Sequence, residues 1–286
     1  AHSPQALIVT ETNVPSHENI SYLGQGDEAH IIYNFPLPPL LLNTLITGSS
    51  RLLTTWLKDL PDPIGGTAYL NFIASHDGIG LRPVEGLLSE QEMERLIQCM
   101  IDFGGKISTR ALNDQEFNPY EINISLWDAF KCTMDRGADK FQADRFICAH
   151  AIMLALKGIP AFYIHSLLAT ENDYERRENL GSNRAVNRHI WDYDALCKKL
   201  ADQDSHHHQV FYCLSDLIAL RKKQPAFHPD AEQSVFNLGP ETVVVKRWTK
   251  TDPNDQTILC VFNTTDHDID VPVDQLPSDC RKHGTD

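Results

Sequence analysis

The stretch Ala68-Tyr-Leu-Asn-Phe-Ile-Ala-Ser-His-Asp-Gly-Ile-Gly-Leu-Arg82 decides how the chain is interpreted, because an apolar run ends there in a polar cluster closed by two glycines. The run from Tyr69 to Ala74 is short, partly aromatic and β-branched, and follows the breaker pair Gly65-Gly66, so it predicts a buried strand. His76 and Asp77 therefore follow the carboxyl end of a strand. In parallel α/β sheets and barrels, that end carries the catalytic and binding groups.

The same pattern occurs near the start of the chain, where the apolar run Ala6-Leu-Ile-Val-Thr10 is followed by Glu11. Two predicted strands thus end in carboxylates, Glu11 and Asp77. One such carboxylate can simply cap a turn, but two of them favour a site. Paired carboxylates suit glycosyl chemistry, in which one exchanges a proton with the bridging oxygen and another stabilises positive charge on the sugar ring.

Composition bounds the class of protein. A chain of 286 residues that is 42% hydrophobic can bury a full core. The net charge of -14 argues against a nucleic-acid partner. No apolar stretch reaches the roughly 18 residues of a membrane helix, and no secretory signal is visible, so we expect no membrane association. Seven cysteines without CxxC spacing predict reduced thiols and a cytoplasmic protein.

Strands and helices alternate in the predicted order. Residues 29–35 predict a second strand, and residues 40–60 predict one helix, mildly interrupted at Gly48, before the strand at Tyr69. Residues 143–157 predict an apolar helix with Gly158 as its C-cap, and residues 159–164 predict the next strand. The fold class is therefore α/β.

Less regular segments separate these units. Residues 13–28 and 167–193 are expected to be loops, and residues 82–139 an insertion that folds over the strand ends. Within it, Ser89 and Glu92 form a capping box that opens a helix.

Pro225 and Pro229 predict a domain boundary, which gives a catalytic domain at 1–228 and a β domain at 229–286. The last amphipathic helix, 210–223, precedes this boundary. In the β domain, strands at 242–248 and 257–263 are joined by a hairpin turn at 252–255.

Other polar residues are interpreted either as a site or as ordinary structural features. Arg184 and Arg188, in Ser182-Asn-Arg-Ala-Val-Asn-Arg-His189, suit a carboxylate or phosphate, or simply pair with acidic neighbours in a solvated loop. The run His206-His-His208 is interpreted as a solvated loop, so no metal site is expected. His150, on an apolar helix face, is expected to be a core residue.

Four segments resemble the sucrose phosphorylase branch of the α-amylase superfamily, glycoside hydrolase family 13: Leu7-Ile-Val-Thr-Glu-Thr-Asn-Val-Pro15, Ala74-Ser-His-Asp-Gly-Ile-Gly-Leu-Arg-Pro83, Asn118-Pro-Tyr-Glu-Ile-Asn-Ile-Ser125 and Gly158-Ile-Pro-Ala-Phe-Tyr163. The resemblance implies the C-terminal half of a (β/α)8 TIM barrel, strands 5 to 8. Residues 82–139 would be an insertion after strand 7, and a small antiparallel β domain would follow the barrel.

The resemblance also implies roles. Glu11 looks like the acid/base, Asp77 like the transition-state stabiliser, and His76 like a ligand of the sugar hydroxyls. No stretch matches the strand that carries the nucleophile. We therefore expect a fragment of a longer protein that is inactive alone, or else a half-barrel that self-associates through its open edges.

The acceptor is suggested by two departures from the family pattern. Sucrose phosphorylases tend to have a His and a Gln where this chain has Asn13 and Glu121. This favours glucosylglycerate phosphorylase, with sucrose 6-phosphate phosphorylase next. Arg188 is also a candidate for holding the glucose, and Asn187 beside it is expected to bind the substrate. The cations available for an anionic acceptor are His17, Arg82, Arg184 and Arg188.

The leading hypothesis is a retaining glycosyltransferring phosphorylase that uses inorganic phosphate to release α-glucose 1-phosphate from glucosylglycerate, sucrose 6-phosphate or sucrose. It implies a small-molecule sugar as partner and no cofactor. The alternatives are an α-glucoside hydrolase and a non-catalytic, truncated remnant. The first is distinguished by its product, which would be free glucose.

Overall fold

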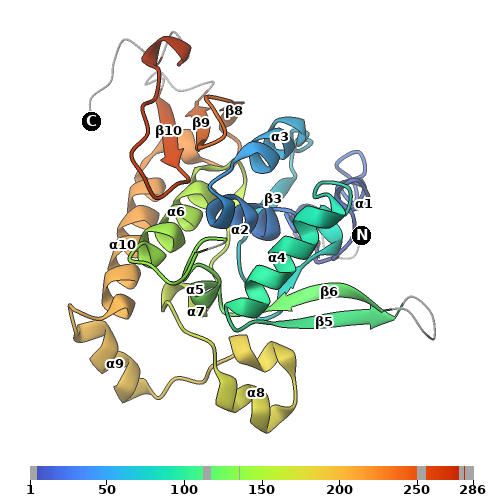
Figure 1. Ribbon diagram of the computed structural model, residues 1–286. Helices are drawn as coiled ribbons and strands as arrows, with labels where there is room; N and C mark the ends of the chain where they lie inside the picture. Colours follow the sequence, from blue (N-terminus) through green and yellow to red (C-terminus); the bar gives the residue numbers. More distant parts are fainter. Residues whose placement is uncertain (1–4, 112–116, 135, 250–255, 277–279, 281–286) are drawn as a thin grey trace.

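A computed structural model describes residues 5–111, 117–134, 136–249, 256–276 and residue 280 (Figure 1). All seven cysteines are free thiols, as expected. Among the described helices, none has the length and hydropathy that a membrane span requires.

A four-stranded parallel sheet forms the centre of the fold, in the order β1-β2-β3-β7. Its strands are β1 (Val9–Thr10), β2 (Ile31–Tyr33), β3 (Ala68–Asn71) and β7 (Ile159–Pro160). They correspond to the four predicted strands, although each is shorter. Because all neighbours pair in parallel, the four carboxyl ends share one edge. The sheet is a partial barrel.

Two helices, rather than one, connect β2 to β3. The predicted helix over residues 40–60, mildly interrupted at Gly48, is in fact two helices: α2 (Leu37–Thr47) and α3 (Arg51–Asp59) are separated at Gly48. Gly48 has φ +70°, and its N–H donates to the Thr44 carbonyl. A left-handed glycine ends a helix in this way because no side chain opposes that conformation.

The helix before β7 also ends earlier than predicted. α6 (Gln142–Ala155) has its C-cap at Leu156, so Gly158 lies beyond the helix. Gly158 has φ +114°, and a Cβ there would be 2.6 Å from the Tyr69 carbonyl oxygen. This glycine therefore allows the chain to approach β3 closely, and His150 on α6 is buried as expected.

The described part of residues 82–139 contains helices and a hairpin, and its bounds as an insertion stay a prediction. The capping box of α4 (Glu90–Asp102) is present, with reciprocal bonds between Ser89 and Glu92. A second sheet has the order β4-β6-β5, with β4 (Ile79–Gly80), β5 (Lys106–Ala111) and β6 (Phe117–Asn123). Figure 1 shows the β5–β6 hairpin extending from the body of the molecule. β4 directly follows Asp77, so the insertion lies beside the carboxylate.

Segments predicted as loops are partly helical. The remaining helices are α1 (Ser16–Ser21), α5 (Leu126–Ala129), α7 (Ile164–Leu167), α8 (Tyr174–Leu180), α9 (Tyr193–Ala201) and α10 (His206–Lys223), with 3₁₀ turns that include Arg82–Val84 and Asn183–Asn187. The interpretation of the His206–His208 run as a loop was wrong, because Ser205 caps α10 and the histidines form its first turn.

The C-terminal segment forms an antiparallel sheet in the order β10-β9-β8, with β8 (Glu232–Phe236), β9 (Thr242–Trp248) and β10 (Thr257–Asn263). Val243 and Val245 of β9 belong to the same buried cluster as Phe146 of α6. The predicted turn at 252–255 lies outside the described residues, and the domain boundary near residue 228 stays a prediction.

Candidate active site

The carboxyl ends of the parallel strands gather polar side chains at one edge. Glu11 follows β1, Tyr33 ends β2, and Asp77 follows β3. Burial raises the pKa of Tyr33, and the charge of Glu11 raises it further. Glu11 therefore acts electrostatically on the neighbouring strand. Its own side chain is exposed.

A second tyrosine lies close to Asp77. Burial raises the pKa of Tyr163, while the charge of Arg188 lowers it and that of Asp77 raises it. Tyr163 follows β7, the neighbour of β3. Because β2 lies between β1 and β3, the strands that precede Glu11 and Asp77 are about 10 Å apart, from a spacing of about 4.8 Å per strand.

Two guanidinium groups bind the Asp77 carboxylate. Arg184 Nη1 lies 2.7 Å from Asp77 Oδ1, and Arg188 Nη2 lies 3.0 Å from the same oxygen. Arg188 Nε donates to the carbonyl of His76 at 2.7 Å. Both guanidinium groups contact the same carboxylate oxygen, and these charge-assisted contacts hold the carboxylate in one orientation.

Asn187 fixes the backbone on which Asp77 sits. Its buried amide donates to the carbonyls of Ser75 at 2.8 Å and Asp77 at 3.3 Å. The Tyr163 hydroxyl donates to the Asn187 carbonyl at 2.7 Å. Asn187 therefore supports the backbone of the segment that carries Asp77.

Glu121 is the second partner of Arg184. Arg184 donates to it bidentately, from Nε at 3.0 Å and from Nη2 at 2.7 Å, and Asn123 Nδ2 donates to Glu121 Oε1 at 2.9 Å. Glu121 is only 2% exposed. The bonds and charges of Glu121 and then Asp77 raise the pKa of Arg184 despite its burial. Of the two interpretations of the arginine segment, this geometry matches pairing with acidic neighbours.

Gly78 makes this arrangement possible. A Cβ on Gly78 would lie 2.5 Å from Glu121 Cγ and 2.4 Å from the Ile122 carbonyl oxygen. Only a residue without a side chain lets β6 lie this close to the segment after Asp77.

Asn13 and Arg82 form a separate polar pair on the Glu11 side. Arg82 Nη1 donates to the Asn13 carbonyl at 3.3 Å. A Cβ on Gly80 would lie 2.8 Å from Asn13 Oδ1, so the amide packs on the glycine. Asn13 Oδ1 and Arg82 Nε are buried without hydrogen-bond partners in the described part of the chain. Buried polar atoms without partners are rare in proteins, so this pair is a candidate contact for a ligand.

Two more predicted residues, besides Glu11, have exposed side chains. The His76 ring is 61% exposed, with Nε2 3.5 Å from Asp77 Oδ1. His17 lies on α1 and is exposed. Sequence reasoning missed Tyr33, Tyr163 and Asn123. A tyrosine at the end of each predicted strand was the available signal for the first two.

No family model matches the chain. The chain is 39% identical over 246 residues to a glucosylglycerate phosphorylase of Escherichia coli (strain K12). The aligned region covers 86% of this chain and 44% of that protein. It is 38% identical over 267 residues to a glucosylglycerate phosphorylase of Allomeiothermus silvanus. That alignment covers 93% of this chain and 47% of the relative. The chain spans about half the length of these curated relatives.

A solved structure is similar in fold. The sucrose 6F-phosphate phosphorylase from Thermoanaerobacter thermosaccharolyticum superposes with a TM-score of 0.71 at 23% identity, over 88% of this chain and 47% of that one. The partial barrel and its β domain therefore correspond to about half of that protein.

Proposed function

Because the chain belongs to the sucrose phosphorylase branch of the α-amylase superfamily, glycoside hydrolase family 13, we propose that it carries the acid/base and the transition-state stabiliser of a retaining glucoside phosphorylase. The reaction would transfer glucose to inorganic phosphate and release α-glucose 1-phosphate. Its nucleophile would lie in the part of the relatives that this chain does not span.

The observation that carries the proposal is the Asp77 carboxylate held between Arg184 and Arg188 at the edge of a parallel sheet. A carboxylate fixed before the reaction stabilises charge as it develops on the sugar, without reorganisation. The two arginines fix the position of the Asp77 carboxylate, which suits it to stabilise positive charge on the sugar.

Glu11 suits the other task. Its exposed carboxyl follows β1, and no hydrogen bond or ion pair is found for it among the described residues. A carboxyl without a fixed cation partner can carry a proton to the leaving oxygen and accept one later. The two carboxylates therefore differ in environment as their roles require.

The acceptor is proposed to be anionic, with glycerate as the leading case. Arg184 is matched by Glu121 and Asp77, so its charge is already balanced. Arg82 differs, because no described carboxylate pairs with it and its Nε is buried without a partner. Arg82 is thus the best candidate to hold glycerate or phosphate, with His17 in reserve. The relatives at 38% and 39% identity are both glucosylglycerate phosphorylases, which supports this choice.

The open edge of the sheet is proposed as the place where the remaining half of the barrel pairs, or where a second copy pairs instead. Leu7, Ile8 and Val9 on and beside β1 are 70%, 52% and 48% exposed. An unpaired apolar edge strand offers backbone groups to another strand.

The test is an assay of full-length enzyme in which this chain is joined to the remaining half of a glucosylglycerate phosphorylase. With phosphate and glucosylglycerate, α-glucose 1-phosphate should accumulate with retained configuration. Sucrose and sucrose 6F-phosphate are tested in parallel. Free glucose as the main product in the presence of phosphate would favour an α-glucoside hydrolase instead.

A further inference from the structure

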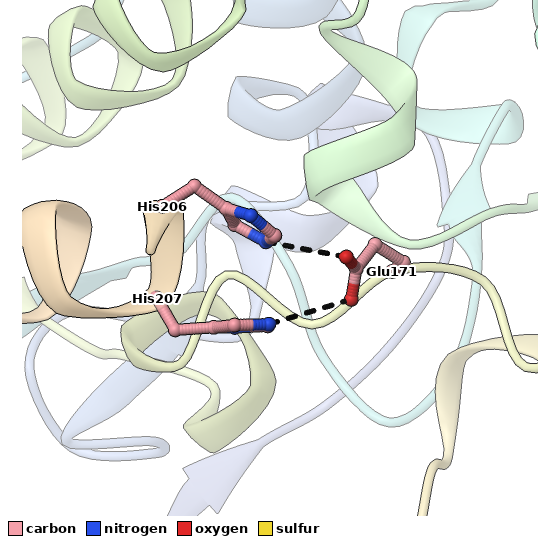
Figure 2. Close-up of side chains that lie close together, drawn as sticks. All are labelled: Glu171, His206 and His207. Carbon is pink, nitrogen blue, oxygen red and sulfur yellow. Dashed lines mark ion pairs between the residues drawn. The ribbon is translucent and has the colours of Figure 1, made fainter. Parts of the chain in front are cut away.

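Three side chains that can ligate a metal lie together, apart from the residues around Asp77. Figure 2 shows His206 and His207, from the first turn of α10, directed at the carboxylate of Glu171, from the loop between α7 and α8. His206 Nε2 lies 3.3 Å from Glu171 Oε1, and His207 Nε2 lies 3.7 Å from Oε2. One ligand atom from each residue lies within 4.8 Å of the others.

The hydrogen bonding of His207 points to a cation. His207 is 1% exposed, and its Nδ1 lies 2.6 Å from the Leu168 carbonyl oxygen, so Nδ1 carries a proton and donates. In the neutral ring, Nε2 then bears a lone pair that faces the carboxylate of Glu171. A metal ion bound between the His207 Nε2 lone pair and the Glu171 carboxylate would satisfy both acceptors. A ring N–H bonded to a backbone carbonyl is also the usual orientation of a metal-binding histidine.

Packing fixes the orientation of the His206 ring. Its ring stacks on Trp127, with centroids 4.5 Å apart and planes 11° apart. Its Nε2 also lies 3.2 Å from the carbonyl oxygen of Ala169, whose φ of +45° is unusual for a residue with a side chain. This carbonyl oxygen would be a further donor beside an ion bound at His206 Nε2, and such binding requires the neutral His206 ring to carry its proton on Nδ1.

We propose that Glu171, His206 and His207 bind one divalent transition-metal ion of the Zn²⁺ type. Two imidazoles and a carboxylate are donors that Zn²⁺ accepts, and bonds of about 2.0 to 2.2 Å in a tetrahedron place ligand atoms roughly 3.3 Å apart. The two imidazoles face different oxygens of Glu171, at 3.3 and 3.7 Å, which are distances of that order.

The ion would fix the loop that leads to the arginine segment. Asn172, next to Glu171, donates its N–H to Asp128 Oδ2 at 2.6 Å, and Asp173 donates its N–H to the Val186 carbonyl at 2.8 Å. A bond from Glu171 to α10 would therefore hold the segment that carries Arg184 and Arg188. The role is structural, and Glu171 is exposed enough for the ion to enter.

The test uses the full 286-residue chain, stripped with a chelator and titrated with ZnCl₂ against a chromophoric zinc indicator. One equivalent should bind. Glu171→Gln and, separately, His206→Gln should each weaken binding by at least roughly 100-fold, since the loss of a supporting partner alone costs 10- to 100-fold. The matched control is His208→Gln, because His208 Nδ1 bonds to the Leu200 carbonyl instead, and it should keep the parent affinity.

Three outcomes would overturn the proposal. The first is no saturable binding by the parent chain. The second is parent affinity in both Glu171→Gln and His206→Gln, which would place the ion elsewhere, for example on a thiol. The third is an equal loss in His208→Gln, which would indicate binding by the histidine run without the carboxylate. Circular dichroism of each variant shows that it is folded as the parent is.

Discussion

Arg188 Nη2 lies 3.0 Å from Asp77 Oδ1, and the Nε of the same guanidinium donates to the His76 carbonyl at 2.7 Å. One side chain thus binds both the carboxylate and the backbone beside it. Asp77 is therefore held in place by a cationic partner, and Glu11 has no such partner in the described chain. This difference gives each carboxylate its own test.

Asp77→Asn should lower kcat of the full-length enzyme by at least about 100-fold, the cost of removing one preorganised electrostatic group. The loss should be similar for substrates with good and poor leaving groups, because charge on the ring develops in both. Steady-state kinetics with glucosyl fluoride and glucosylglycerate measure it. A defect confined to the poor leaving group would reassign Asp77 as a proton donor.

Glu11→Gln should behave in the opposite way. An amide cannot protonate the leaving oxygen, and general acid help is worth roughly 10²- to 10⁴-fold. The loss should appear with glucosylglycerate and be small with glucosyl fluoride, which needs little protonation. The same two substrates measure it. An equal loss with both would mean that Glu11 is not the acid.

The strand ends were predictable because they depend on local patterns. An apolar run that stops at Glu11 or Asp77 is visible in the sequence, and parallel pairing then brings the ends to one edge. The capping box at Ser89 is equally local. These features need no knowledge of the tertiary fold.

The partners of the arginines were not predictable in the same way. Arg184 and Glu121 are separated by 63 residues, and their pairing depends on how β6 packs beside Gly78. The pairing of Glu171 with His206 depends likewise on tertiary structure. The His run was misjudged because Ser205 was not recognised as an N-cap, although the residue type allows it.

His150 should give the chain a pH-dependent stability. Burial lowers its pKa from 6.5 to about 4, although Nδ1 has the Phe146 carbonyl as partner. Between these two pH values the unfolded chain binds a proton at His150 and the folded chain does not. The free energy of unfolding therefore decreases as pH falls from about 6.5 towards 4. A shift of this size corresponds to about 3 kcal/mol.

The measurement is urea unfolding of the chain and of His150→Leu between pH 7 and pH 4.5. The free energy of unfolding should fall less steeply in the variant, so the two curves should converge or cross as pH falls. Parallel curves would show that His150 titrates normally in the folded state. Leu is a suitable replacement because the ring stacks between Phe146 and Phe162.

Gly158→Ala should destabilise the chain by about 2 kcal/mol or more. Its φ of +114° is strained for any residue with a side chain, at about 1 to 3 kcal/mol, and the new methyl group would meet the Tyr69 carbonyl. Gly65→Ala is the control, because nothing lies within 4 Å of a Cβ there. Urea midpoints compare them. Equal midpoints would mean that the link before β7 rearranges freely.

Arg82→Ala should separate phosphorolysis from hydrolysis. A retaining enzyme forms a glucosyl intermediate that water can attack, so an anionic acceptor needs fixed positive charge where it binds. Arg82 has no described carboxylate partner and a buried, unpartnered Nε. One charge-assisted contact is worth about 1.5 to 3 kcal/mol, or roughly 10- to 150-fold in affinity. The variant should lose glycerate or phosphate affinity by that factor and keep its slow hydrolysis.

Arg184→Ala is the matched comparison, because it removes the same charge from a different environment. It would leave Glu121, which is 2% exposed, without its bidentate partner, and Asp77 with one guanidinium instead of two. Hydrolysis and phosphorolysis should therefore fall together, with their ratio unchanged. The ratio of glucose 1-phosphate to glucose in the full-length enzyme decides between the two arginines. If the ratio falls in Arg184→Ala and not in Arg82→Ala, Arg184 and not Arg82 binds the anion. The ion pair between Arg184 and Glu121 would then have to break when the substrate binds.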